Sequence, residues 1–411
     1  MTAQELIGLV GEWEGHRVGT VGPGPGPDHG EAMELWVELF PVKGPGRCGI
    51  CGTLCASIHD VTERFVRELP VFGKACWLLL HRRRVFCKRC GGPRVERLSW
   101  LEPWARHTTR FAQSVARLCK MATVKDAAQH YGIDWKTAKA IDKRYLEKEL
   151  GPPNLAGLRV VIMDAFAIRK GQRYATVFLE PTHKEVLWVC RGHGREEVRS
   201  FFEALGEEGR EQLEAVVMDM DGAFEAEVRS QCPKAEIVFD LYHVVAKYSH
   251  EVINRVRLQE IERLERDAPE RHLIKGSRWL LLRNPRNLNR SKDRVRLKEL
   301  LDANRKLTKV HLLREDLKHL WDYTYPGAAR RFWTQWYHRA IHSRIEPLKR
   351  FARRLKPYLA GIIAHCKYPF HTSLLEGINN TIKVIKRKAY GFHDDEYFFL
   401  KIRQAFPGNR R

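Results

Sequence analysis

Two Cys-x-x-Cys pairs place the strongest constraint on how the first hundred residues of this chain can fold. The pairs are Cys48-Gly-Ile-Cys51 and Cys87-Lys-Arg-Cys90. Each pair can form a short turn that offers two thiolates to one ion, and two such turns complete a tetrahedral zinc site. The sequence therefore predicts that one structural Zn²⁺ joins two segments that are far apart in the chain.

The other cysteines leave some alternatives open. The spacer between Cys51 and Cys87 is longer than the usual ribbon separation, and a redox motif would explain either pair alone but not both together. Disulfides are disfavoured because residues 1–15 lack an export signal and the cytosol keeps thiols reduced. Cys55 is a spare thiol that could compete for a ligand position. The solitary cysteines are interpreted as buried small residues: Cys76, Cys119, Cys190, Cys232 and Cys366.

The charge balance of the chain calls for an anionic partner. Its 72 Lys and Arg residues exceed its 50 Asp and Glu residues by a formal net charge of +22. Nucleic acid is the leading candidate, because Lys and Arg gain affinity by displacing counterions from phosphates; the alternative is a basic surface with no such partner. Apolar residues make up 44% of the 411 positions, which excludes wholesale disorder. The length predicts roughly two to four domains.

No stretch of the sequence approaches the roughly 18 consecutive apolar residues that a membrane helix needs. The longest apolar run, Ala75–Leu80, ends at His81. We therefore expect no membrane partner and a cytoplasmic, nucleoid-associated protein. The basic run His81-Arg-Arg-Arg84 beside the second cysteine pair suits either a contact with the DNA backbone or a solvated basic face.

Residues 124–144 have the pattern of a helix-turn-helix. Small residues in Val124–Tyr131 let two helices approach, Gly132 makes the turn, and Trp135–Arg144 would be the recognition helix. The basic side chains expected to face phosphates or bases are Lys136, Lys139, Lys143 and Arg144. The alternative is that these helices only pack a core.

Glycine and proline divide the chain into segments of different character. Gly22–Gly30 predicts a loop tip or linker, and Gly151-Pro-Pro-Asn154 predicts the main domain boundary. One apolar run between these two breakers predicts a strand at 34–42. After the second breaker, apolar runs predict strands at 159–168, 174–180, 185–190, 213–220 and 236–240, with an amphipathic helix at 195–206. After residue 158, this is the element order of an RNase H-like α/β fold. Residues 242–359 predict helices.

Carboxylates interrupt two of the apolar strands. Asp164 lies within Val160–Ile168, and burying it is costly unless it binds a cation or accepts hydrogen bonds. Asp219 and Asp221 end the strand Val216–Asp221 on one face. Because the first and fourth strands of this fold are neighbours, the acids can meet and share metal.

A third acid, Glu376, opens a late helix. It forms one stripe with Asn380, Lys383 and Arg387, which suits a metal site that handles phosphates. Taken singly, each of the three acids is better explained as a strand-end or cap residue than as a catalyst.

These motifs together resemble the ISL-three family of insertion-sequence transposases, which carry a DDE catalytic domain. The resemblance rests on both cysteine pairs, Asp164, Asp219-Met220, Asp240-Leu-Tyr-His243 and the long motif from Glu376 to Gly391. It implies a multidomain α/β protein with an RNase H-like catalytic core split by a helical insertion, preceded by a small zinc-binding module and a helix-turn-helix. The expected parts are a β-rich zinc-binding module (1–100), a helix-turn-helix domain (101–150), the first part of the core (151–245), an all-helical insertion (246–365) and a final helical part with Glu376 (366–411).

Carried over residue by residue, the resemblance implies that Asp164, Asp219 and Glu376 are the catalytic triad. The chain departs from the family pattern at Ala165, where Glu is usual, and at Asp221, which could replace Asp219 as a ligand. His243 would position DNA or a carboxylate; the alternative is a hydrogen-bonded core histidine.

The activity implied by the resemblance is DNA transposition. The three acids would hold two Mg²⁺ (or Mn²⁺) ions about 3.5 to 4 Å apart. The protein would bind the terminal inverted repeats in double-stranded DNA, cut the element ends and join the 3′-hydroxyls to target DNA, acting as a homodimer or higher assembly on DNA. Lys383 and Arg387 would contact DNA behind Glu376. The alternatives are a non-catalytic DNA-binding regulator derived from a transposase and a structure-selective nuclease without joining activity.

Overall fold

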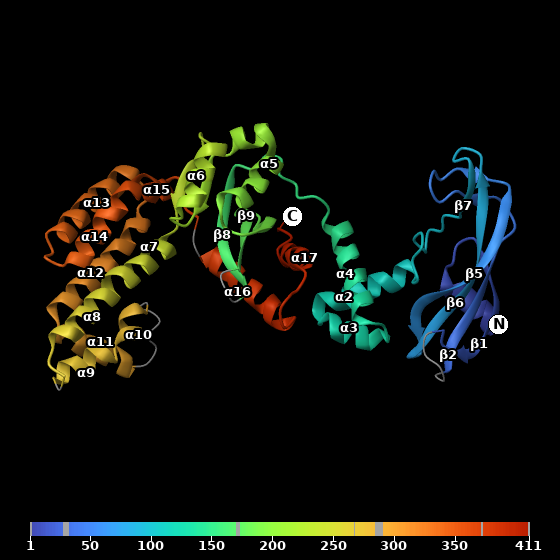
Figure 1. Cartoon of the computed structure of the whole chain (residues 1–411), viewed down its shortest axis with the longest axis horizontal. Helices are drawn as coiled ribbons and strands as arrows, with labels where there is room; N and C mark the ends of the chain where they lie inside the picture. Colours follow the sequence, from blue (N-terminus) through green and yellow to red (C-terminus); the bar gives the residue numbers. More distant parts are fainter. Residues whose placement is uncertain are drawn as a thin grey trace. The chain divides into compact units, whose positions relative to one another are not determined.

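The computed structural model describes residues 2–27, 33–169, 173–266, 268–283, 291–370 and 373–409. The chain divides into two compact units (Figure 1): residues 1–151 with 388–391, and residues 152–387 with 392–411. The first boundary lies at Gly151, directly before Pro152 and Pro153, which cannot continue a helix.

A five-stranded sheet dominates the start of the first unit. Its strands follow the order β1-β2-β6-β5, and β7 pairs with β6. Its core includes Trp13, Val37, Leu39, Leu78 and Leu80. The elements are α1 (Ala3–Gly11), β1 (His16–Pro25), β2 (Met33–Pro41), β3 (Gly46–Arg47), β4 (Leu54–Cys55), β5 (Ile58–Val71), β6 (Lys74–Cys87) and β7 (Gly92–Val95).

The prediction of a loop from Gly22 was wrong for residues 22–25. These residues continue β1, where Gly22 pairs with Trp36 and Pro25 pairs with Met33. Proline is tolerated because β1 is an edge strand, so an amide that faces outward has no ladder partner to lose. Residues 28–30 of the predicted loop lie outside the described residues.

Three helices complete the first unit: α2 (Thr109–Met121), α3 (Val124–Tyr131) and α4 (Trp135–Leu150). Gly132 ends α3 with a φ of 61°, a left-handed conformation that glycine adopts without strain. The Asp134 side chain accepts a hydrogen bond from the Lys136 N–H and caps α4. The helices share a small core and are joined to β5 by Arg67, which donates to the Tyr131 carbonyl at 3.0 Å. The predicted helix–turn–helix geometry is therefore present.

The second unit is built on another five-stranded sheet, with the order β10-β9-β8-β11-β12. Strand β9 runs antiparallel to both β8 and β10, whereas β11 runs parallel to both β8 and β12. The bounds are β8 (Val160–Arg169), β9 (Arg173–Glu180), β10 (Glu185–Arg191), α5 (Arg195–Gln212), β11 (Ala215–Met218), α6 (Gly222–Gln231) and β12 (Glu236–Phe239). The predicted order of strands and helices, and the pairing of the first strand with the fourth, are confirmed.

The two faces of this sheet contact different helices. Val161 and Met163 of β8 belong to a core that includes Val198 and Phe201 of α5. Residues of the opposite parity on β8, such as Ile162, pack in a second core with α16 (Ser373–Lys388) and α17 (Asp395–Ala405). In Figure 1, α5 and α6 lie on one side of β8 and β9, and α16 and α17 lie on the other.

The segment between β12 and α16 is helical within its described residues. Its core is continuous with the α5 side of the sheet and includes Tyr248, Trp333 and Trp336. The helices are α7 (Leu241–Tyr248), α8 (Asn254–Arg263), α9 (Pro269–Lys275), α10 (Arg278–Leu282), α11 (Ser291–Ala303), α12 (Arg305–Lys318), α13 (Pro326–Ile341), α14 (Glu346–Leu355) and α15 (Leu359–Ile363). A π-helical turn, Ser249–Ile253, joins α7 to α8.

Candidate catalytic and metal sites

The two cysteine pairs lie in two similar turns. Cys48 to Cys51 form the turn between β3 and β4, and Cys87 to Cys90 form the turn between β6 and β7. A glycine in the left-handed region follows each pair, Gly52 with φ 74° and Gly91 with φ 66°. Glycine allows the chain to reverse sharply there, so that both sulfurs of a pair lie on the same side of the turn.

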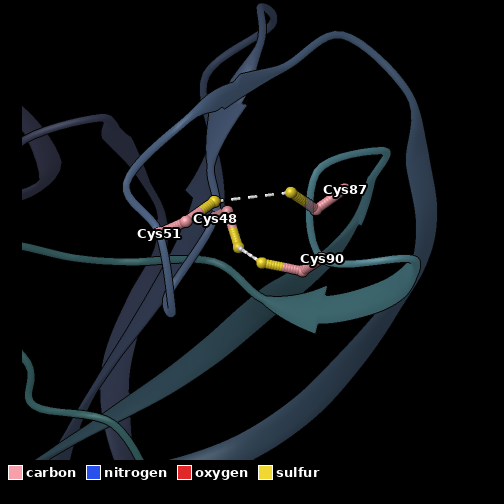
Figure 2. A group of neighbouring side chains, drawn as sticks. All are labelled: Cys48, Cys51, Cys87 and Cys90. Carbon is pink, nitrogen blue, oxygen red and sulfur yellow. Dashed lines mark hydrogen bonds between the residues drawn. The ribbon is translucent and has the colours of Figure 1, made fainter.

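The four sulfurs of these turns converge on one point (Figure 2). All four Sγ atoms lie within 4.8 Å of one another. Cys48 Sγ is 3.9 Å from Cys90 Sγ, and Cys51 Sγ is 3.5 Å from Cys87 Sγ. A tetrahedral ion with metal–sulfur bonds of about 2.3 Å requires sulfur–sulfur separations of about 3.8 Å. The donor set and its spacing therefore fit a structural Zn²⁺.

Local hydrogen bonds favour thiolates in the first turn. The backbone N–H of Cys51 lowers the pKa of Cys48, and hydrogen bonds from Thr53 lower the pKa of Cys51 to about 6. Cys55 is buried beside this group but is not one of its four ligands; its Sγ lies 3.5 Å from the Thr53 carbonyl. Burial raises the pKa of Cys55, but the hydrogen bond with Cys51 raises the pKa of the ligand Cys90 as well, so position rather than pKa separates Cys55 from the four ligands.

The middle of the basic run before Cys87 is buried, so Arg82 and Arg83 do not form the solvated basic face that was one of the two alternatives. Arg82 and Arg83 are buried, and Arg83 donates to both carboxylate oxygens of Glu96. Arg84 pairs with Asp60 in the same bidentate way. All three arginines lie on the interior strand β6, but only Arg83 is a buried charge with an ion-pair partner; Arg82 donates to the Glu96 carbonyl, and its Nε and Nη1 have no partner within the described residues. The sequence analysis counted the charge of these arginines, but the pairing of Arg83 with Glu96 and of Arg84 with Asp60 depends on the folded sheet.

Three aspartates form a row across the second sheet. The β8–β11 pairing matches Val217 with Ile162, so two residues further on Asp219 falls beside Asp164. The β11–β12 pairing matches Met218 with Phe239, which places Asp240 next to Asp219. All three have the parity of the residues that pack towards α16 and α17, so the row lies on that face of the sheet.

His243 lies among these three carboxylates. Its Nε2 is 3.9 Å from Asp164 Oδ1 and 3.7 Å from Asp240 Oδ2, and its Nδ1 is 4.0 Å from Asp219 Oδ2. Burial raises the pKa of Asp240 to about 6, with a further contribution from the charges of Asp164 and Asp219. Burial and the charges of Asp221 and Asp164 also raise the pKa of Asp219. The site is thus an accumulation of negative charge that a cation would relieve.

Asp221 has a structural role at the start of α6. Its Oδ1 accepts hydrogen bonds from the N–H groups of Ala223 and Phe224, as a helix cap does. By contrast, Asp219 Oδ1 is buried and has no hydrogen-bond partner within the described residues. Asp219 therefore offers a buried oxygen without a partner to a ligand, whereas Oδ1 of Asp221 is engaged by the start of α6.

The late helix reaches the aspartates through a residue that sequence reasoning missed. Asn379 Nδ2 of α16 donates a hydrogen bond to Asp164 Oδ2 at 2.6 Å. Glu376 is exposed one turn earlier in α16, and the described part of the chain does not bring its carboxylate into a group with Asp164 and Asp219. The prediction followed the stripe through Asn380, which is exposed. The available signal was that Asn379 borders the buried residues Ile378 and Ile382.

The basic side chains predicted to contact DNA have different environments. Lys136 is exposed on the first turn of α4, whereas Arg144 is paired with Glu102. Lys139 and Lys143 are half-buried on the same helix, and Lys383 and Arg387 are exposed on α16. None of the helices in the described ranges combines the length and apolar character that a membrane crossing requires.

Family models match three successive parts of the chain. A family model for the DDE domain of ISL3 transposases, described as a transposase, matches residues 161–402. A helix-turn-helix domain of transposase family ISL3 matches residues 96–146, and a zinc finger of the IS204/IS1001/IS1096/IS1165 transposases matches residues 44–90. The three matches cover the cysteine turns, helices α2 to α4 and the sheet that carries the aspartates.

Two named relatives agree with these matches. The chain is 46% identical to the transposase for insertion sequence element IS1001 of Bordetella parapertussis over 411 residues, which is 100% of both chains. It is 26% identical to the transposase for insertion sequence element IS1557 of Mycobacterium tuberculosis, over 89% of this chain and 86% of the relative. The chain is an insertion-sequence transposase and belongs to the ISL3 family.

Proposed function

We propose that this transposase binds the terminal inverted repeats of its element, cuts at the element ends and joins the freed 3′-hydroxyls to target DNA. We assign the chemistry to Asp164, Asp219 and Glu376. The observation that carries this proposal is the placement of Asp164 and Asp219 side by side on neighbouring parallel strands, with Asp219 Oδ1 buried and unpartnered within the described residues.

The sheet supports an RNase H-like catalytic core. Three antiparallel strands followed by two parallel ones, in the order β10-β9-β8-β11-β12, match the topology expected for that fold. We propose that residues 246–365 are a helical insertion between the two parts of this core, 151–245 and 366–411. We further propose that residues 1–100 and 101–150 act as the zinc-binding and DNA-reading modules.

The residues at this site suit a hard divalent cation such as Mg²⁺ or Mn²⁺. Carboxylate oxygens are the ligands that these ions prefer, and the unsatisfied Asp219 Oδ1 lies beside Asp164. When bound, such ions would activate the attacking hydroxyl and stabilise the leaving oxygen. Asp164 and Asp219 would hold them from the sheet, Glu376 would approach from α16, and His243 would hold the carboxylates in place when the ions are absent.

Two surfaces offer positive charge to DNA. In the first unit, Lys136 and its neighbours on α4 would read the element ends. In the second unit, Arg255, Arg350 and Arg353 are exposed around a hollow of about 580 Å³ between α8 and α14. Among the described residues these three arginines have no ion-pair partner, unlike Arg354, which pairs with Glu251. We propose that this hollow holds DNA flanking the cut site.

The proposed reaction also determines the assembly and the place of action. Two element ends must be held together during transposition, so we expect a homodimer or a higher assembly on DNA. Because the proposed substrate is double-stranded DNA, the protein would act in the cytoplasm and associate with the nucleoid when bound to DNA.

The decisive experiment uses purified protein with Mg²⁺ and two DNA substrates, one with intact element ends and one with pre-cut ends that carry free 3′-hydroxyls. The wild-type protein should cut the first and join the second to target DNA. Asp164→Asn should lose both activities and retain end binding, because one carboxylate charge is removed from the site.

Each of the other possible results would indicate a different function for this protein. Cutting without joining would indicate a nuclease. End binding without either reaction in the wild type would indicate a non-catalytic regulator. Cutting by Asp164→Asn would refute the catalytic assignment.

A further inference from the structure

The hydrogen bond between Asn379 and Asp164 joins α16 to the middle of β8. Asp164 Oδ2 is a carboxylate oxygen and can only accept, so the amide nitrogen of Asn379 must face it, at 2.6 Å. The other oxygen, Oδ1, accepts from the N–H of Ala165 at 2.8 Å. Within the described chain, Asn379 is therefore the one side chain that holds the orientation of the Asp164 carboxylate by a direct hydrogen bond.

A second contact shows that α16 lies along β8. Lys386 Nζ donates to the carbonyl of Ala167 at 3.4 Å. From Asn379 to Lys386 the helix rises about 10 Å, since each residue adds about 1.5 Å. From Asp164 to Ala167 the strand also advances about 10 Å, at about 3.3 Å per residue. The two hydrogen bonds are therefore compatible with one fixed alignment of the helix along the strand.

This alignment determines where Glu376 can reach. Residues three apart on a helix share one face, with their Cβ atoms about 5 to 6 Å apart. Asn379 therefore anchors α16 to Asp164 one turn after Glu376. The apolar neighbours Ile378 and Ile382 hold the helix against the sheet, but such contacts tolerate sliding better than a short hydrogen bond to a charged group does.

From these contacts we propose that Asn379 is a positioning residue for the transposition reaction. Its amide N–H fixes the Asp164 carboxylate and, through the same bond, sets the distance at which Glu376 approaches the aspartates. The inference rests on the proposed function, because it assigns Asn379 a role in the same site. In this role, Asn379 acts by positioning Asp164 and Glu376 and does not itself contact the DNA.

The other amide atom, Asn379 Oδ1, offers an alternative role to be tested, which is direct binding of a cation. This oxygen is buried and without a hydrogen-bond partner among the described residues, so it could itself bind a cation. The isosteric change Asn379→Asp separates the two roles. It removes the N–H that Asp164 needs and keeps an oxygen that a metal ion can bind.

The experiment measures end binding, thermal stability, joining of pre-cut ends and the Mg²⁺ concentration at half-maximal joining for each variant. Asn379→Ala and Asn379→Asp should both lower joining by about 10- to 100-fold and raise the Mg²⁺ requirement, the range expected when a partner of a metal ligand is removed. End binding should stay unchanged. Asn379→Gln, which retains an amide donor, should recover part of the activity.

Neighbouring variants supply the controls. Val384→Ala and Val384→Ser change an exposed side chain on the same helix and should retain wild-type joining and Mg²⁺ dependence. Wild-type joining and Mg²⁺ dependence in Asn379→Asp would overturn the positioning role, as would a loss of stability that accounts for the whole effect in every Asn379 variant. Because Asp164→Asn is measured in parallel, activity in that variant would refute the proposed function separately.

Discussion

Asp219 follows β11 at the position that lies beside Asp164 of β8, so two carboxylates from distant parts of the sequence meet on one face of a parallel strand pair. The strand pairing itself produces this proximity, because parallel strands place residues of matched register side by side. His243 contacts both acids from α7. The position of each acid on its strand therefore carries more functional information than the number of acids does.

Asp219 and Asp221 should respond differently to substitution. Asp219→Asn should lower cleavage and joining by at least about 100-fold, because it removes charge from the proposed metal site. Asp221→Ala should instead lower the free energy of unfolding by about 1 kcal/mol through loss of the α6 cap, with near wild-type catalysis. Reaction rates and urea unfolding of both variants check this. If Asp221→Ala abolished catalysis and Asp219→Asn did not, Asp221 rather than Asp219 would be the metal ligand.

The zinc site should depend on four cysteines and not on Cys55. Wild-type protein and Cys55→Ser should each contain one Zn²⁺ per chain, whereas Cys87→Ser should lose the metal. Because metal binding supplies folding energy to such sites, Cys87→Ser should also melt at a lower temperature. Metal analysis and thermal melting decide the matter, and loss of zinc from Cys55→Ser would show that the ligand set is wrong.

Arg83 should matter for stability rather than for DNA binding. Arg83→Ala leaves Glu96 buried without its partner and should cost about 3 to 5 kcal/mol of unfolding free energy. The salt dependence of end binding by the folded fraction should not change. Glu96→Gln offers the matching change on the other side of the pair. A shallower salt dependence in Arg83→Ala, with unaltered stability, would indicate the DNA contact instead.

The hollow between α8 and α14 gives a prediction about salt. Replacing Arg255, Arg350 and Arg353 together by alanine should reduce the slope of log affinity against log salt by about 2 to 3 for DNA with flanking sequence, since each lost phosphate contact contributes about 0.9. The double variant Arg330→Ala and Arg331→Ala, which changes exposed arginines of α13, is the control. Equal slopes in the triple variant and the wild type would exclude this surface.

His311 should make the helical segment sensitive to mild acid. Burial, together with the charge of Arg314, lowers the pKa of this imidazole from 6.5 to about 4. The unfolded chain therefore binds a proton at pH 5 that the folded chain does not, so stability falls as the pH drops below about 6.5. The loss from this residue should reach about 2 kcal/mol at pH 5. Urea unfolding of wild type and His311→Gln at pH 7 and pH 5 tests it, and equal pH dependence would contradict the assignment.

Local patterns predicted much of this molecule. The apolar runs around Asp164 and Asp219 predicted strands, and the element order predicted that β8 and β11 are neighbours. The cysteine turns could be predicted because Cys-x-x-Cys is a local geometry. Each of these inferences depends on residues that are close together in sequence.

Long-range partners could not be predicted in the same way. Nothing near Arg83 in sequence indicates that Glu96 would bury and neutralise it, and nothing near Asp164 indicates Asn379. The helical stripe was followed through Asn380 because spacing alone does not say which side of α16 faces the strand. That choice depends on how Ile378 and Ile382 pack against the sheet, which is a property of the folded unit.

The order of the site's parts along the chain has a consequence for synthesis on the ribosome. The cysteine turns, the helix-turn-helix and the row of aspartates all precede residue 241, whereas α16 begins at Ser373. A growing or prematurely ended chain can therefore form the DNA-reading parts before it has Asn379 or Glu376. Such fragments should occupy element ends without cutting them and should compete with complete chains. On the proposed assignment, only a chain that includes α16 can complete the catalytic site.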